Sequence, residues 1–327
     1  MTTSTTSLIT GDWHLDASTR NAYRFAFVEK TLPQLINTYK YGRLICLGDL
    51  CQDKDRHNAE LVNRVVNTTT NLSKLCNVVI LRGNHDYISP ESPFFAFLSK
   101  LPNVTWINKP TLIEDELFLP HTRDHKHDWK GIYNFKGVTR IFAHQTFQGA
   151  NAGNHILDGI PLNVFPEGVD ILSGDVHVPQ KIGRLRYVGA PYTINFGDVY
   201  EPRVLILRSD GKITTMPLRG PRKILLEIED PRRMPEIKLN KGDMLKVRVR
   251  LDKFEEFPKV KKILAEWAAG HEVSVHAIQP MVDAGKSPQR ERGTPKSDAD
   301  HVKAYATKMG VSKDVLEVGL KLLEEGA

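Results

Sequence analysis

Short apolar runs alternate with helical patterns in the first part of the chain. Residues 7–10, 43–47 and 78–81 are apolar runs of strand length, and residues 19–39 and 58–72 between them carry apolar positions at helical spacing. Strands and helices that alternate in this way predict a layered α/β core whose parallel strands are joined by right-handed crossovers.

Later apolar runs follow one another with fewer helical patterns between them. They cover residues 104–107, 116–119, 139–143, 170–172, 185–188, 203–207 and 212–216. Because few helical patterns separate these runs, we expect the second half to form a more antiparallel sheet. The two halves together predict a two-sheet sandwich flanked by helices, at residues 1–218.

The pattern changes after this part of the chain. Two strand-like stretches, a helical stripe and a third strand-like stretch follow, at 224–228, 244–249, 257–269 and 273–278. This order predicts a small α+β domain at residues 219–282.

The end of the chain has the pattern of a linker and a helical tail. Residues 283–299 are rich in Lys, Arg, Gly, Pro and Ser, which is typical of a flexible linker. Residues 300–327 carry an apolar stripe at Leu316, Leu320 and Leu323. Such a short tail cannot bury this stripe alone, which favours a partner or a homodimer; packing on the chain's own surface is the alternative.

Composition places the chain among ordinary globular proteins, with 40% hydrophobic and 26% charged residues. No apolar run reaches the roughly 18 residues of a membrane span, and the polar N-terminus lacks the features of a signal peptide. Three cysteines without metal-type or disulfide spacing predict reduced thiols in a cytoplasmic protein.

The net charge of +6 is concentrated in one segment. Residues 219–262 hold 14 basic and 8 acidic residues, whereas residues 1–218 hold 23 and 21. A basic segment beside a near-neutral one indicates a polyanionic partner. A solvated face on a small domain explains the charge equally well.

Metal-ligand residue types follow directly after five predicted strands. Open α/β sheets place their ligands beyond the carboxyl ends of strands, so we expect these side chains to converge. Carboxylate, imidazole and amide donors without thiolate suit manganese or iron better than a structural zinc site. The candidate metal ligands are Asp12, His14, Asp49, Asn84, His144, Asp175 and His177, and His85 and Asp86 directly follow Asn84.

Two metals at such a site would explain a specific reaction. A pair roughly 3.5–4 Å apart clamps the attacking and leaving oxygens at phosphorus and generates hydroxide near neutral pH. The ligand set therefore predicts phosphoester hydrolysis without a serine or cysteine nucleophile.

The motifs Asp-x-His, Gly-Asp, Gly-Asn-His-Asp, a lone His and Gly-x-x-His stand in one order over residues 8–200. This order resembles the calcineurin-like metallophosphoesterase superfamily. The resemblance implies a two-sheet metallophosphoesterase sandwich, here followed by a small capping domain and the tail. It also implies two metals, held by Asp12, His14 and His177 at the first site, by Asn84, His144 and Asp175 at the second, and by Asp49 at both.

The same resemblance implies that His85 is the general acid or transition-state partner and that Asp86 orients it. Two positions depart from the family pattern. Asp175 stands where the family has histidine, which favours harder ions or leaves the second site weak. Gln52 ends the Gly-Asp motif in place of Asp or His.

The segment 189–198, Gly-Ala-Pro-Tyr-Thr-Ile-Asn-Phe-Gly-Asp, resembles the stretch after the last metal ligand in SbcD-type DNA repair nucleases. This resemblance implies that the capping domain positions DNA and that the tail docks on an SbcC-type ATPase. Candidate phosphate contacts are Arg222, Arg232, Arg233, Lys246, Arg248 and Arg250. Ordinary exposed charges explain any single one of them equally well.

The sequence thus predicts a DNA exo- or endonuclease that acts in DNA recombination, repair or degradation. We expect two Mn²⁺ per chain, and Mg, Fe or Zn are the other possible ions. One alternative is a stand-alone phosphodiesterase or phosphatase on nucleotides or small phosphoesters. Another is a scaffold of the same fold that has lost catalysis. His121, His125 and His127 cluster in a way that a third metal site could use. Because Arg123, Lys126 and Lys130 around them repel a cation, we expect a solvated loop instead.

Overall fold

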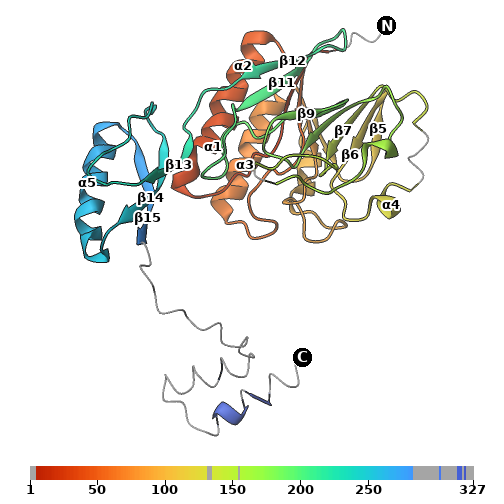
Figure 1. Ribbon diagram of the computed structural model, residues 1–327. Coiled ribbons are helices and arrows are strands. Elements are labelled where there is room, and N and C mark those ends of the chain that lie inside the picture. Colours follow the sequence, from red (N-terminus) through yellow and green to blue (C-terminus); the bar gives the residue numbers. More distant parts are fainter. Residues whose placement is uncertain are drawn as a thin grey trace.

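The computed structural model describes residues 5–130, 135–153, 155–282, 302, 315–318, 320 and 321. Two six-stranded sheets form a sandwich, and helices cover the outer face of the first sheet (Figure 1). A third, three-stranded sheet lies at one side of the sandwich. The predicted α/β sandwich flanked by helices is confirmed.

The first sheet has the order β12-β11-β1-β2-β3-β4. Four of its strands are parallel, β1 (Ser7–Thr10), β2 (Arg43–Cys46), β3 (Asn77–Leu81) and β4 (Val104–Ile107). Two antiparallel strands complete it, β11 (Arg203–Leu207) and β12 (Ile213–Pro217).

Helices connect the parallel strands of this sheet. The connections contain α1 (Ala22–Ala26), α2 (Leu32–Tyr39) and α3 (Ala59–Ser73). A π-helical turn, Phe27–Thr31, joins α1 to α2, so the single predicted helix is interrupted. Asn58 caps α3, because its side chain accepts a hydrogen bond of 2.8 Å from the amide of Leu61.

The second sheet has the order β5-β6-β7-β8-β10-β9. Its strands are β5 (Thr111–Ile113), β6 (Glu116–Leu119), β7 (Arg140–His144), β8 (Asp170–Gly174), β9 (Gln180–Ile182) and β10 (Leu185–Tyr187). The expectation of a more antiparallel sheet is wrong, since β6, β7, β8 and β10 are parallel and the edge strands β5 and β9 are antiparallel to their neighbours. Within the described residues, the long connections before β7 and β8 contain only short helices, α4 (His125–Asp128) and the 3-10 turn Leu162–Val164.

Alternate residues of the two sheets meet in the middle of the sandwich. Ile45 and Leu81 of the first sheet and Phe142 and Leu172 of the second belong to one buried cluster. The other face of the first sheet packs on the helices. A strand that is buried on both faces reads as a continuous apolar run, which is why these strands stand out in the sequence.

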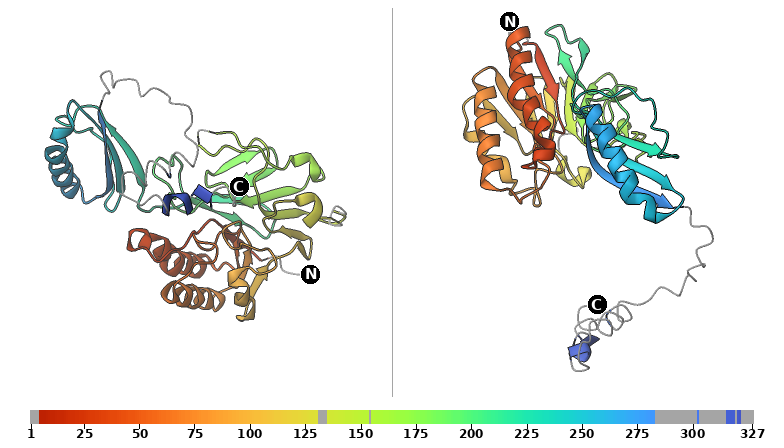
Figure 2. Two further views of the ribbon diagram at one scale, coloured as in Figure 1. Left: turned by 90° about the horizontal axis from the view of Figure 1, so that it is seen from below. Right: turned by 90° about the vertical axis from the view of Figure 1, so that its left-hand side faces the viewer.

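The small sheet consists of β13 (Lys223–Ile228), β14 (Met244–Leu251) and β15 (Ser274–Val282), all parallel. Leu245, Val247 and Val249 pack against α5 (Phe257–Gly270). In both Figure 1 and Figure 2, α5 lies on the side of this sheet away from the sandwich. The opposite face of the sheet therefore turns toward the sandwich.

Several predictions concern parts that the structure leaves aside. The predicted linker at 283–299, and the tail at 300–327 apart from residues 302, 315–318, 320 and 321, lie outside the described residues. The predicted domain boundaries stay predictions.

Among the described residues, no helix combines the length and apolarity of a membrane span. The three cysteines are buried free thiols.

Candidate metal centre

All seven predicted metal ligands lie where the strands of the two central sheets end. The loops after β1, β2 and β3 of the first sheet and after β7 and β8 of the second meet at one edge of the sandwich. Backbone hydrogen bonds tie neighbouring loops together, such as the amide of Asp12 to the carbonyl of Gly48 at 2.9 Å. The expected convergence is therefore observed, residue by residue.

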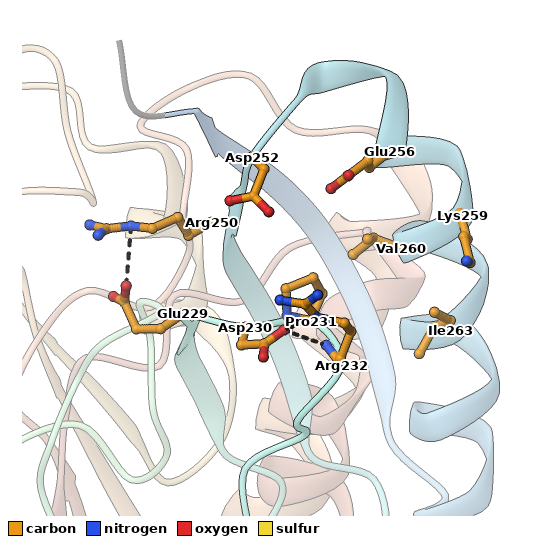
Figure 3. A pocket seen from close by; sticks show the side chains of 10 residues that line it. All are labelled: Glu229, Asp230, Pro231, Arg232, Arg250, Asp252, Glu256, Lys259, Val260 and Ile263. Atoms are coloured by element: carbon orange, nitrogen blue, oxygen red, sulfur yellow. Dashed lines mark hydrogen bonds and ion pairs between the residues drawn. The ribbon is translucent and has the colours of Figure 1, made fainter. Parts of the chain in front are cut away.

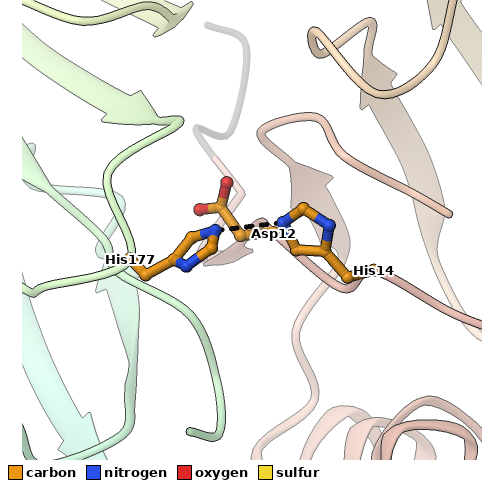
Figure 4. A group of neighbouring side chains, drawn as sticks. All are labelled: Asp12, His14 and His177. Atoms are coloured by element: carbon orange, nitrogen blue, oxygen red, sulfur yellow. Dashed lines mark hydrogen bonds between the residues drawn. The ribbon is translucent and has the colours of Figure 1, made fainter. Parts of the chain in front are cut away.

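The first group consists of Asp12, His14 and His177, whose donor atoms all lie within 4.8 Å of one another. Nε2 of His14 lies 3.0 Å from Nε2 of His177. Figure 4 shows the two rings pointing toward each other with Asp12 between them. Two ligands that share one ion at about 2.1 Å each lie roughly 3–3.5 Å apart, so this spacing is that of a common ion.

The second group surrounds Nε2 of His144. The side-chain oxygen of Asn84 lies 3.1 Å from this nitrogen, Oδ1 of Asp49 lies 3.3 Å from it, and Oδ1 of Asp175 lies 3.7 Å from it. A carboxylate at position 175 therefore reaches the place where the family has an imidazole. Asp175 is also held by the hydroxyl of Thr146, which donates to its Oδ2.

Asp49 belongs to both groups. Its Oδ2 lies 3.3 Å from Nε2 of His14, and its Oδ1 lies 3.3 Å from Nε2 of His144. The two carboxylate oxygens thus face two different sets of ligands, so Asp49 would bridge two ions if each set held one.

The backbone around these ligands is unusual. Asp12, His14, Asp49 and Asp175 all have positive φ, between 44° and 80°. Such left-handed residues cost about 1 kcal/mol or more each outside glycine and concentrate at functional sites. A Cβ at position 83 would lie 2.2 Å from Oδ1 of Asp49, so glycine is required there.

Burial dominates the electrostatics of the centre. It raises the pKa of Asp12 to about 8. Burial, and then the nearby carboxylate of Asp86, raises the pKa of Asp49 well above its usual range. Burial also lowers the pKa of His14 and of His177. The side chains alone therefore leave the carboxylates without a compensating positive charge.

These residues fit divalent metal ions. Within the described part of the chain, Oδ2 of Asp12 is buried without a hydrogen-bond partner. The facing nitrogens of His14 and His177 can share at most one proton as neutral rings. A buried carboxylate needs a cation or donors, and the mixed oxygen and nitrogen donors suit Mn²⁺, Fe or Zn²⁺. The two groups, with Asp49 between them, would hold one ion each.

His85 lies beside the first group. Its ring centroid is 4.7 Å from that of His14, and the rings are nearly perpendicular. Nδ1 of His85 donates to the backbone carbonyl of Gln52 at 2.6 Å. Because a carbonyl oxygen can only accept a hydrogen bond, this contact requires the proton on Nδ1. This bond leaves Nε2 of His85 for the chemistry.

Asp86 was predicted to orient His85, but its hydrogen bonds go to backbone amides. Its carboxylate accepts hydrogen bonds from the amides of Gly83 at 2.6 Å, Leu50 at 2.9 Å and Asp49 at 3.0 Å. It therefore fixes the loops after β2 and β3, while the carbonyl of Gln52 orients His85. Almost every residue has a backbone amide, so the sequence pattern does not reveal which amides a carboxylate binds.

His121 is a neighbour of the centre that the sequence interpretation missed. Its ring lies 6.2 Å from that of His144, and its Nδ1 lies 2.8 Å from the hydroxyl of Tyr87. Burial, and then His144, lowers its pKa to about 3. The expectation of a solvated loop is wrong for this residue. Its position just after β6 was the available clue.

The segment 189–198 connects the sandwich with the small sheet. The hydroxyl of Tyr192 donates to the carbonyl of Trp13, beside the first metal group. The hydroxyl of Thr193 accepts a hydrogen bond of 2.8 Å from the amide of Lys223 in β13. Asp198 accepts from the amides of Ile194 and Asn195, at 3.0 and 2.7 Å, and thereby fixes the turn.

Four of the six predicted phosphate contacts pair with carboxylates of their own region. The pairs are Arg222 with Asp243 at 2.6 Å, Arg232 with Asp230 at 2.9 Å, Arg248 with Glu227 at 3.0 Å and Arg250 with Glu229 at 3.1 Å. Two of these pairs, Arg232 with Asp230 and Arg250 with Glu229, line a cavity of about 330 Å³ near the end of β14 and the start of α5 (Figure 3). Lys246, Arg248 and Arg250 alternate with the residues that pack on α5, so they belong to the face that turns toward the sandwich.

Two solved structures are similar to 64% of this chain. One is Yfce, a phosphoesterase from E. coli, with 16% identity, a TM-score of 0.33 and 98% of its chain covered. The other is the nuclease MPE of Pseudomonas putida, with 17% identity, a TM-score of 0.33 and 87% of its chain covered. At this level, neither bears on the activity of this chain. No curated protein matches it.

A family model gives the clearer result. The model of the calcineurin-like phosphoesterases matches residues 5–207, which is more than half of the 327 residues. The match contains every residue of the two metal-ligand groups described above. The chain therefore belongs to the calcineurin-like phosphoesterase family.

Proposed function

We propose that this protein is a metal-dependent nuclease of the SbcD type, which hydrolyses DNA phosphodiester bonds with two Mn²⁺ per chain. The observation that carries the proposal is the position of Asp49, whose two oxygens lie 3.3 Å from histidines of two different groups. When bound there, divalent ions would activate water and neutralise charge on the phosphate.

The residues around these groups prepare the site for a phosphodiester. The carbonyl of Gln52 holds one proton on Nδ1 of His85. When the ring takes up a second proton on Nε2 and becomes the imidazolium, Nε2 can deliver that proton to the leaving oxygen. Asp86 fixes the loops that carry Asp49 and His85. This preorganisation lowers the cost of reorganisation during the reaction.

Two observations support DNA as the substrate. The segment 189–198, which resembles SbcD-type nucleases, binds the first strand of the small sheet. Lys246, Arg248 and Arg250 lie on the face of that sheet that turns toward the sandwich, where a polyanion could lie against them. An SbcC-type ATPase or a second copy at the tail, and a cytoplasmic location, belong to the same proposal.

A nuclease assay with Mn²⁺ tests the proposal. We expect cleavage of single- or double-stranded DNA by the wild type, and a loss of about 10²–10⁴-fold in kcat for His85→Ala. Asp49→Ala should abolish turnover. His155→Ala, an exposed histidine outside the site, is the matched control. Equal cleavage by all four proteins would contradict the assignment of the site.

A phosphodiesterase on small phosphoesters is the second candidate. The four arginine–carboxylate pairs favour it, because they reduce the free positive charge available to DNA. Turnover of bis-p-nitrophenyl phosphate without cleavage of any DNA would support this candidate over the nuclease.

A further inference from the structure

Arg24 of α1 is a buried cation next to the metal centre. It is 3% exposed. Its Nη1 donates to the backbone carbonyl of His14, to Oδ2 of Asp16 at 3.2 Å and to Oε1 of Gln52 at 3.3 Å. One guanidinium nitrogen therefore joins the loop after β1 to the loop after β2.

Both loops carry residues of the proposed reaction. The loop after β1 presents His14, and the loop after β2 presents Gln52, whose carbonyl holds His85 at 2.6 Å. A shift of Arg24 would therefore change the distance between a metal ligand and the proposed general acid. The hydrogen bonds of Arg24 go to the carbonyl of His14, to Asp16 and to Gln52 rather than to either imidazole ring.

The hydrogen bonds continue from Arg24 toward the small sheet. Oδ2 of Asp16 also accepts a hydrogen bond of 2.6 Å from the side-chain amide of Asn21. Oδ1 of Asn21 accepts a hydrogen bond of 3.1 Å from Nζ of Lys223. Lys223 is the first residue of β13, so four side chains connect the small sheet with the centre.

Lys223 is firmly held at its end of this chain of contacts. It is 8% exposed, and its Nζ donates to the carbonyl of Ile194 at 3.0 Å. The rings of Tyr23 and Phe196 lie 5.8 and 5.6 Å from Nζ, which is within the range of cation–π contacts. A movement of β13 therefore displaces Lys223 together with the segment 189–198.

The charges make these contacts costly to break. Asp16 lies between Arg24 and Asn21, and it is the carboxylate that pairs with the buried guanidinium. Removing one partner of a buried ion pair leaves an uncompensated charge, which is strongly unfavourable.

We propose that Arg24 is a positioning residue that sets His14 and His85 relative to each other, and that Lys223, Asn21 and Asp16 transmit the position of the small sheet to it. This inference rests on the proposed function for its kinetic consequence. A ligand that moves the small sheet would thereby change the rate of hydrolysis at the metal centre.

Kinetics of three variants test the transmission, with bis-p-nitrophenyl phosphate and Mn²⁺. Asn21→Ala and Lys223→Met should each lower kcat by about 10–100-fold with little change in KM, because misplacing a reacting group by about 1 Å has an effect of this order. The double variant should be no slower than the slower single variant, since both changes break one network. Lys212→Met, an exposed lysine of the hairpin before β12, is the control and should match the wild type.

The second measurement does not depend on turnover. In the metal-free protein, NMR signals of the His14 and His85 rings should shift in Asn21→Ala, Lys223→Met and the milder Arg24→Lys, and stay in place in Lys212→Met. Unshifted rings in Asn21→Ala and Arg24→Lys, or multiplicative losses of kcat in the double variant, would overturn the proposal. If the NMR signals of the rings shift in these variants but the wild type has no phosphoesterase activity, the positioning role of Arg24 stands and the proposed function is refuted.

Discussion

Oδ1 of Asp49 lies 3.3 Å from Nε2 of His144, although the two residues come from different sheets of the sandwich. The contact joins the end of β2 to the end of β7. It depends on the face-to-face packing of the two sheets, because neither sheet alone carries both groups of ligands. The stability of the sandwich and the integrity of the metal centre are therefore coupled.

The first prediction concerns the metal stoichiometry. Asp175→Asn should reduce the number of Mn²⁺ bound from two to one, because Oδ1 of Asp175 faces the second group at 3.7 Å from His144. Titration calorimetry on chelator-treated protein gives the count. Asp170→Asn, at the start of the same strand, is the control. If the wild type binds one equivalent of Mn²⁺ and shows no turnover, the result would instead support a scaffold that has lost catalysis.

The second prediction concerns Gly83. Gly83→Ala should lower the free energy of unfolding by about 1–3 kcal/mol and abolish high-affinity Mn²⁺ binding, because the new Cβ would lie 2.2 Å from Oδ1 of Asp49. Urea unfolding and metal titration measure the two effects. Gly220→Ala, where a Cβ meets nothing within 4 Å, should leave both unchanged. Normal metal binding by the Gly83 variant would show that the loop has room.

The third prediction concerns Asp86. Asp86→Ala leaves three buried amides without an acceptor, those of Gly83, Leu50 and Asp49. Each orphaned donor costs about 1–3 kcal/mol, so the urea midpoint should fall well below that of an Asp53→Ala control. A midpoint equal to that of the control would mean that water replaces the carboxylate.

The fourth prediction concerns pH. Burial, and then Arg24, lowers the pKa of Lys223 from 10.5 to about 8, against the opposite effects of Asp16 and Asp198. Below pH 8 both the folded and the unfolded protein hold this proton. Between pH 8 and about 10.5 the folded protein has lost it and the unfolded protein retains it, so stability rises with pH.

The measurement for this prediction is the difference in urea midpoint between the wild type and Lys223→Met. This difference should shift in favour of the wild type from pH 8 to about 10.5. A constant difference, or a shift in favour of the variant, would mean that the pKa of Lys223 is not lowered.

Much of the fold was predictable because its strands are buried on both faces. The runs at Ser7–Thr10, Val104–Ile107 and Arg203–Leu207 agree with the observed strands at both ends. The short edge strands Thr111–Ile113 and Gln180–Ile182 were missed. Three-residue strands that are partly exposed carry neither an apolar run nor a clear alternation.

The sequence by itself determined which residues could meet in the metal centre, because each one ends or closely follows a strand and glycines accompany most of them. The roles of the surrounding residues depended on the tertiary structure. Asp86 holds backbone amides, Arg24 joins two loops, His121 reaches His144, and four arginines pair with carboxylates. The sequence shows which side chains stand at the ends of strands. Their hydrogen-bond partners are fixed only when the sheets and loops have packed together.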